Sequence, residues 1–182
     1  MCGFVGFYNL KESNSRDYEI LRKMTKSLKN RGPDDEGFYY DKNVFFGHRR
    51  LVIIDPDHGK QPMSFSYFGN EYILVYNGQL YNAKELRKEL LEKGFEFSGY
   101  SDTEVLLKAF IYFGTNVLPR LNGIFSFAIW NKTKKELFLV RDHFGIKPLY
   151  YSLVDNSLIF GSEVKALCEH PKIKLELDST GI

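Results

Sequence analysis

The stretch IFSFAIWNKTKKELFLV, residues 124–140, decides the fold class of this chain. It holds two apolar runs, 124–130 and 137–140, joined by a short segment rich in lysine. The connection has the length of a β-hairpin, which makes the two runs antiparallel neighbours. Both runs are apolar at consecutive positions, which indicates burial on both faces of the sheet. An antiparallel sheet covered on both faces requires more than two layers.

Other segments extend this pattern along the chain. Further strands are predicted where short β-rich runs are bounded by Gly, Pro, Asn or Asp, at residues 4–8, 44–47, 50–55, 72–76 and 149–152. Three amphipathic helices are predicted over 17–29, from Asn82 to Gly94 and from Ser101 to Gly114. The last two open with a capping-box pattern, because Glu85 and Glu104 follow at the third position. The pattern as a whole predicts two sheets packed between helices.

Composition limits the class of protein. With 182 residues, of which 43% are hydrophobic and 26% charged, the chain has the material for one globular domain. It contains no apolar run long enough for a membrane helix and no signal-peptide pattern, so we expect no membrane partner. Two cysteines are too few for a disulfide framework, which favours a cytoplasmic location.

The charge pattern gives no sign of nucleic-acid binding. The net charge is +2, and the densest basic run, residues 132–135, is expected to be a solvated hairpin tip. The four histidines and two cysteines form no metal-ligand spacing, so no metal is expected.

Cys2 directly follows the initiator methionine. A small second residue permits removal of Met1, which would leave a thiol and a free α-amine on one residue. An α-amine has a pKa of about 7.7–8.0 and a thiol about 8.5, so the amine can accept the thiol proton near neutrality. Cys2 is therefore a candidate nucleophile that carries its own base. The alternative is a small apolar filler at a frayed terminus.

Further motifs favour the nucleophile. In chain order they are MCGFVGFYN (1–9), RGPDDEG (31–37), GHRRLVIIDP (47–56), YNGQLYN (76–82), SDTEVLLKAF (101–110), LNGIFSFAIWN (121–131), RDHFGIKPLYY (141–151) and FGSEVKALCEHP (160–171). The first five resemble class II glutamine amidotransferases. With the last three, the chain closely resembles the N-terminal glutaminase domain of glutamine-hydrolysing asparagine synthetases. The resemblance implies an α+β fold of the N-terminal-nucleophile hydrolase type, a four-layer αββα sandwich with two mainly antiparallel sheets between helices.

The resemblance also assigns groups that bind a zwitterionic amino acid. In the family, the arginine of a His-x-Arg-Leu motif binds the α-carboxylate of glutamine, which corresponds to Arg50 rather than Arg49. A guanidinium can bind a carboxylate through two parallel hydrogen bonds. The family pocket continues along the following backbone, which corresponds to Leu51, Val52, Ile53 and Ile54. The alternative for Arg50 is a surface arginine.

Asp102 corresponds to the family residue that binds the α-amine of the substrate. Its alternative is local, since an acid in the first turn of a helix is stabilised by the helix dipole without any ligand.

Asn77 and Gly78 correspond to the oxyanion hole of the family, with the Asn77 side-chain amide and the Gly78 N–H as donors. The alternative is a type I′ hairpin turn, which Asn-Gly between apolar residues favours strongly. Gln79 departs from the family, which usually has a glutamate there that helps to hold the amino end of the substrate. A neutral amide removes one charge from the predicted site.

The predicted function is hydrolysis of the glutamine side-chain amide to glutamate and ammonia through a Cys2 thioester. Residues 1–170 are expected to form the glutaminase domain, and residues 171–182 the start of a linker towards a synthetase domain. The pyrophosphate loop of that domain is absent, so the chain is expected to be a fragment or one of a pair.

The expected partners, cofactors and alternative functions are considered against the same resemblance. Glutamine, a synthetase domain in cis or in trans and possible homodimer formation are the expected partners. No cofactor is expected in this chain, and ATP and magnesium are expected only for the missing domain. The alternatives are an inactive glutamine-binding or partner-binding module, suggested by Gln79, and an amidotransferase domain that serves another ammonia acceptor.

Overall fold

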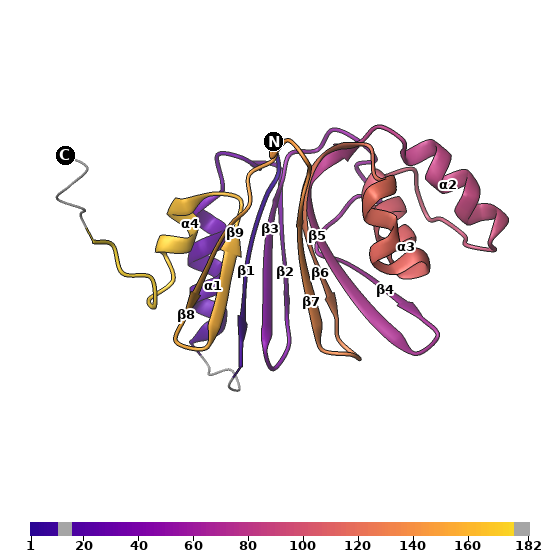
Figure 1. Cartoon of the computed structure of the whole chain (residues 1–182). Coiled ribbons are helices and arrows are strands. Elements are labelled where there is room, and N and C mark those ends of the chain that lie inside the picture. Colours follow the sequence, from indigo (N-terminus) through magenta and orange to yellow (C-terminus); the bar gives the residue numbers. More distant parts are fainter. Residues whose placement is uncertain (11–15, 177–182) are drawn as a thin grey trace.

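The computed structural model describes residues 1–10 and 16–176 and forms two β-sheets with helices on their outer faces (Figure 1). The strands are β1 (Gly3–Asn9), β2 (Asp35–Tyr40), β3 (Val44–Arg50), β4 (Met63–Tyr67), β5 (Asn70–Leu80), β6 (Gly123–Asn131), β7 (Glu136–Arg141), β8 (Tyr150–Val154) and β9 (Ser157–Gly161). The helices are α1 (Asp17–Ser27), α2 (Ala83–Glu92), α3 (Asp102–Phe113) and α4 (Val164–Cys168), with a 3₁₀ helix at Gly114–Arg120.

Both sheets are antiparallel throughout. The first has the order β2-β3-β1-β9-β8, and the second has the order β4-β5-β6-β7. The strands β6 and β7 form the predicted hairpin, with Asn131 opposite Glu136. In the first sheet, β1 lies between β3 and β9, so the amino-terminal strand occupies the centre.

Three hydrophobic clusters explain the layers. The cluster between the sheets is rich in aromatic residues, with Phe4, Phe46 and Phe160 from one sheet against Trp130 of the other. A second cluster packs α1 and α4 on the first sheet, and a third packs α2 and α3 on the second. Figure 1 shows this sequence of helices, sheet, sheet and helices across the molecule. The predicted four-layer αββα sandwich is confirmed.

Several predicted elements differ from the structure. The predicted strand 50–55 is wrong beyond Arg50, because β3 ends there and residues 51–59 have no regular structure. Strands β2, β4 and β9 are missing from the sequence-based prediction. β2 alternates too weakly, since all its residues are partly exposed or exposed.

Asn77 and Gly78 lie inside β5 and pair with Ser126 and Phe125, so the hairpin alternative is wrong. At Gly78 a side chain would collide with the backbone of Ile124 and Phe125, which explains the glycine by close approach rather than by a turn.

The helix starts follow the prediction in part. The Ser101 side chain accepts a bond from the Glu104 N–H and caps α3 as expected. Asn82 makes no such cap, since its side chain bonds the carbonyl of Arg120 and the N–H of Asn122 instead. That pair ties the start of α2 to the segment before β6.

Within the described residues, no helix is long and apolar enough to cross a membrane. The predicted boundary near residue 170 stays a prediction. Residues 171–176 follow α4 without regular structure, and the rest of the predicted linker lies outside the described residues.

Candidate active site

A pocket of about 80 Å³ lies where the chain enters β1 and leaves β3. It draws on segments far apart in the sequence, namely the amino terminus, the 51–59 loop, the end of β5 and the start of α3. Its lining residues are Cys2, Arg50, Leu51, Ile53, Ile54, Gly59, Gln61, Tyr76, Gly78, Gln79, Asp102 and Thr103.

The Cys2 thiol is held by backbone groups of Leu51. The Leu51 N–H points at Cys2 Sγ over 3.4 Å, and the thiol lies 3.6 Å from the Leu51 carbonyl oxygen. Arg31 Nε donates to the carbonyl of Cys2 over 3.0 Å, which fixes the backbone of the residue. Burial raises the pKa of the thiol, while the Leu51 N–H, the amino-terminal charge and Arg50 oppose that rise. Cys2 is therefore anchored at both its side chain and its backbone.

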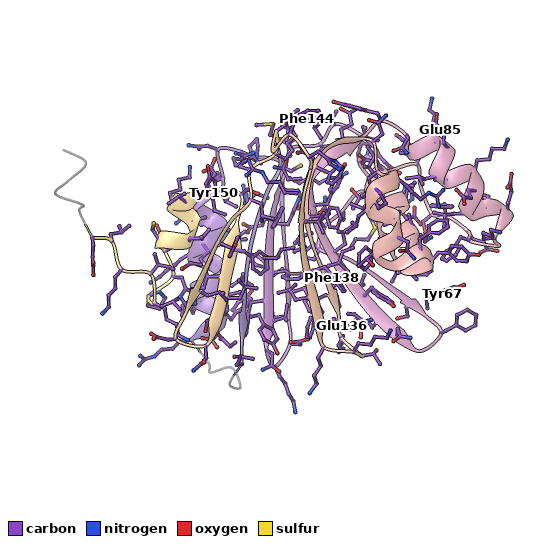
Figure 2. All side chains as sticks on the ribbon, in the orientation of Figure 1. Tyr67, Glu85, Glu136, Phe138, Phe144 and Tyr150 are labelled. Carbon is purple, nitrogen blue, oxygen red and sulfur yellow. The ribbon has the colours of Figure 1, made fainter. Side chains whose placement is uncertain are left out.

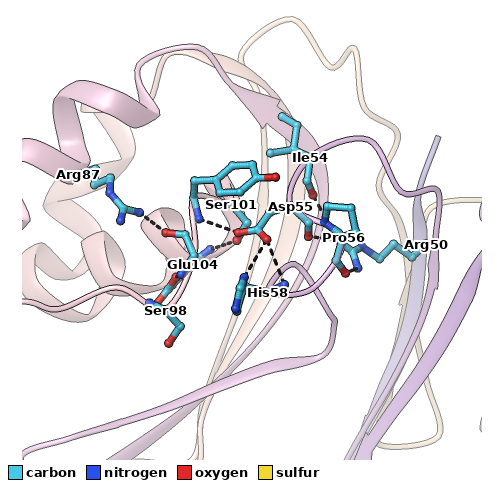
Figure 3. Close-up of polar contacts among 11 residues, drawn as sticks. Arg50, Ile54, Asp55, Pro56, His58, Arg87, Ser98, Ser101 and Glu104 are labelled. Carbon is cyan, nitrogen blue, oxygen red and sulfur yellow. Dashed lines mark hydrogen bonds and ion pairs between the residues drawn. The ribbon is translucent and has the colours of Figure 1, made fainter.

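Arg50 is buried, so the surface alternative is wrong. Its Nη1 donates to the carbonyl of Pro56 over 2.8 Å, and its Nη2 donates to the carbonyls of Ile54 and Asp55 over 3.2 and 2.7 Å. The guanidinium thus binds the backbone of the 51–59 loop at three carbonyl groups (Figure 3). Arg50 also lines the pocket. Arg49 points elsewhere, to the carbonyl of Gly32 and the carboxylate of Glu36.

Asp55 joins this loop to the segment before α3. Its Oδ1 accepts bonds from the His58 N–H and ring Nδ1, and its Oδ2 accepts a 2.6 Å bond from the Tyr100 N–H (Figure 3). Burial alone would raise the pKa of Asp55, but the bonds from Tyr100 and His58 outweigh it and lower the pKa. The loop that holds Arg50 is therefore fastened to the segment that carries Asp102.

Asp102 is buried at the first turn of α3. Its Oδ2 accepts bonds from the Tyr76 hydroxyl over 2.8 Å and from the Leu80 N–H over 3.0 Å. No hydrogen bond to Oδ1 comes from residues 1–10 or 16–176. One carboxylate oxygen is thus fixed by protein donors, and the other is left for the pocket.

Asn77 does not line the pocket, although Gly78 and Gln79 beside it do. The Asn77 side chain is 2% exposed, and its amide nitrogen has no partner in the described part of the chain. Arg31 Nη2 and His48 Nδ1 are likewise buried without a partner there. Both belong to residues near the same end of the sheet, since Arg31 bonds Cys2 and His48 pairs with Phe4.

The whole chain, residues 1–182, matches the family described as "Glutamine amidotransferase domain". The chain belongs to this family. Among its relatives, asparagine synthetase [glutamine-hydrolyzing] 3 of Bacillus subtilis is 43% identical over 182 residues. The match covers 100% of this chain and 30% of that protein. Asparagine synthetase [glutamine-hydrolyzing] 1 of the same organism is 44% identical over 170 residues, or 92% of this chain and 26% of the relative. The chain thus spans about a third or less of these relatives.

Solved structures agree on the fold. A glutamine phosphoribosylpyrophosphate amidotransferase from B. subtilis, solved with ADP and GMP, superposes with a TM-score of 0.80 at 24% identity. The match covers 96% of this chain and 44% of that chain.

This glutamine amidotransferase domain brings most of the predicted site residues into one pocket. Val52 and Asn77 are the exceptions, and the Val52 N–H instead bonds the carboxylate of Asp34 over 2.8 Å. Through that contact and the one between Arg31 and Cys2, the RGPDDEG motif fixes the loop near the thiol.

Four lining residues, namely Gly59, Gln61, Tyr76 and Thr103, were missing from the sequence-based site. Tyr76 and Thr103 directly adjoin predicted residues, so adjacency was their only signal. Gln61 had none, because its role comes from a 2.6 Å bond that it accepts from the Tyr76 N–H across the fold.

Proposed function

We propose that this chain hydrolyses the side-chain amide of glutamine to glutamate and ammonia, with Cys2 as the nucleophile. One observation carries the proposal. A single pocket presents a thiol, a buried guanidinium and a buried carboxylate, which match the electrophile and the two charged ends of free glutamine.

Binding uses the two charged groups. Arg50 keeps donors beyond the three bonds that it makes to loop carbonyls, since a guanidinium carries five N–H groups. These donors are available to the α-carboxylate. Asp102 Oδ1 accepts from the α-ammonium, while Leu51, Ile53 and Ile54 line the space around the substrate.

Catalysis begins once Met1 has been removed. The free α-amine of Cys2 takes the thiol proton, and the thiolate adds to the side-chain carbonyl carbon of glutamine. Asn77 and Gly78 donate to the resulting oxyanion, and the unpartnered amide nitrogen of Asn77 supports this role. The nitrogen leaves as ammonia with the proton from the amine. Water then attacks the thioester, which gives glutamate and regenerates the thiol.

The ammonia acceptor is proposed from the relatives, whose names describe glutamine-hydrolysing asparagine synthetases. We propose that ammonia passes to a synthetase domain in cis or in trans for asparagine synthesis. ATP and magnesium would act in that domain. Shielding the transfer from water keeps ammonia from being protonated and lost. The predicted homodimer stays a prediction.

The test uses Cys2→Ala and Cys168→Ala as a matched pair. Purified chain should release glutamate from glutamine, and mass spectrometry of active material should show a chain that begins at Cys2. Cys2→Ala should abolish hydrolysis with an unchanged melting temperature. Cys168→Ala should keep at least half of the activity, because this cysteine lies at the end of α4 and outside the pocket.

Three outcomes would contradict the proposal. Full activity from chain that retains Met1 would refute the terminal-amine mechanism. Loss of activity in Cys168→Ala alone would identify a different nucleophile. Glutamine binding without turnover in chain that begins at Cys2 would favour the alternative of an inactive binding module.

A further inference from the structure

Tyr76 is a buried polar residue of the pocket to which the steps above assign no role. Three of its groups are held by three different residues. Its N–H donates to Gln61 Oε1 over 2.6 Å, its carbonyl lies 3.1 Å from His48 Nε2, and its hydroxyl donates to Asp102 over 2.8 Å. Burial and the nearby Asp102 carboxylate raise the pKa of Tyr76 well above its ordinary value, so the hydroxyl stays protonated as a donor.

These bonds decide which oxygen of Asp102 faces a ligand. The Tyr76 hydroxyl and the Leu80 N–H both bond Oδ2, and both donors come from β5. A carboxylate held at one oxygen by two donors cannot rotate without breaking both bonds. Its second oxygen is therefore held in one place. The same strand carries Gly78 and Gln79 into the pocket.

We infer that Tyr76 is a positioning residue that fixes Asp102 for the α-ammonium group, so that the site selects glutamine with a free amino end. This inference rests on the proposed function. It predicts that the Tyr76 hydroxyl matters for glutamine and does not matter for an analogue that lacks the α-amino group. Glutaramate, which keeps the carboxylate and the amide, is such an analogue.

The test measures binding of both compounds by calorimetry in the Cys2→Ala chain, which cannot turn glutamine over. Adding Tyr76→Phe should weaken glutamine binding about tenfold, the order expected for one hydrogen bond to a charged group. Glutaramate binding should change less than twofold. Tyr72→Phe, the same deletion four residues earlier on β5, is the matched control and should leave both affinities unchanged.

A double-mutant cycle checks that the effect passes through Asp102. In an Asp102→Asn background, Tyr76→Phe should cause no further loss of glutamine affinity, because the two changes act on one contact. Equal losses for glutamine and glutaramate, or an undiminished loss in the Asp102→Asn background, would overturn the inference.

Failure of the proposed function has a different signature. If processed wild-type chain binds glutamine with the Tyr76 dependence described but releases no glutamate, the hydrolysis proposal fails and the inference stands. If the Cys2→Ala chain binds no glutamine, both fail. If hydrolysis proceeds and Tyr76→Phe leaves discrimination between the two compounds unchanged, only the inference fails.

Discussion

Two loops of this molecule, residues 51–59 and the loop that follows β7, are each held by an arginine and an aspartate that bind the loop backbone. In the 51–59 loop, Arg50 binds carbonyl groups and Asp55 accepts N–H groups. In the loop that follows β7, Arg141 donates to the carbonyls of Gly145 and Lys147 over 2.5 and 3.0 Å. Asp142 there accepts bonds from the N–H groups of four residues: Phe125, Phe144, Ile146 and Lys147.

The difference between the loops lies in the burial of the arginine. Arg50 is buried and lines the pocket, whereas Arg141 is exposed. The second loop displays Phe144, which is 90% exposed and lies beyond the ends of the strands, at the top of Figure 2. The same pairing of arginine and aspartate therefore borders a pocket in one place and forms a surface turn in the other. Burial, more than the residue pair, decides which of the two results.

Replacing the two arginines tests this comparison most directly. Arg50→Ala should lower glutamine affinity at least tenfold and the free energy of unfolding by about 2–4 kcal/mol, because three loop carbonyls, among them the buried one of Asp55, lose a charged donor. Arg141→Ala should lower the free energy of unfolding by about 0.5 kcal/mol, since water replaces an exposed donor. Calorimetric binding and urea unfolding measure both effects.

Similar losses of unfolding free energy for Arg50→Ala and Arg141→Ala would show that burial of the arginine does not distinguish the two loops. Arg49→Ala is unsuitable as a neutral control, because Arg49 itself bonds Gly32 and Glu36.

For the two aspartates, the larger loss in the free energy of unfolding is expected in the loop that follows β7. An asparagine has one acceptor oxygen, so Asp142→Asn would leave two of four N–H groups without a partner and lower the free energy of unfolding by about 2–3 kcal/mol. Asp55→Asn should cost about 1–2 kcal/mol, since Asp55 accepts only two backbone N–H groups and the His58 ring. Urea unfolding at neutral pH measures both, and a larger loss at Asp55 would contradict this order.

Acid unfolding gives a second readout of the same carboxylates. Hydrogen bonds outweigh burial and lower the pKa of both Asp55 and Asp142. A lowered pKa in the folded state means that the stabilisation is complete above the unfolded value of about 3.9 and is lost as the pH falls through the folded value. Wild-type stability should therefore fall below about pH 4. Both asparagine variants should show a shallower fall there, and an unchanged slope would argue against these assignments.

Gln79→Glu should have the smallest effect, and it tests the part of the pocket that is proposed to bind the α-ammonium group of glutamine. Restoring the family's carboxylate adds a charge for the α-ammonium and should improve glutamine affinity by about 0.5–1.5 kcal/mol. Asp102 lies in the same pocket, so repulsion in the empty site should leave the melting temperature unchanged or slightly lower. Steady-state kinetics should show a lower KM. A higher KM would mean that Gln79 suits another ligand.

The sequence predicted the layers because they depend on local signals. The 124–140 hairpin and the apolar faces of the first three α-helices follow from period and turn length alone. The predicted strand at 50–55 failed since LVII has strand-like composition but its backbone is held by Cys2, Asp34 and Arg50. Arg50 and Asp102, which the family motifs singled out, line one pocket in the structure. Gln61 and Tyr76 escaped prediction because their roles exist only through contacts across the fold.

The central position of β1 has a consequence for synthesis of the chain. This strand is synthesised before its neighbour β9, which follows about 150 residues later along the chain, with Gly6 opposite Phe160. Until then one edge of β1 has no partner, and the pairing that completes the sheet has a high contact order, which slows folding. Met1, which precedes this strand, is 55% exposed in the finished fold, so the removal of Met1 that the proposed mechanism requires does not depend on opening the sheet.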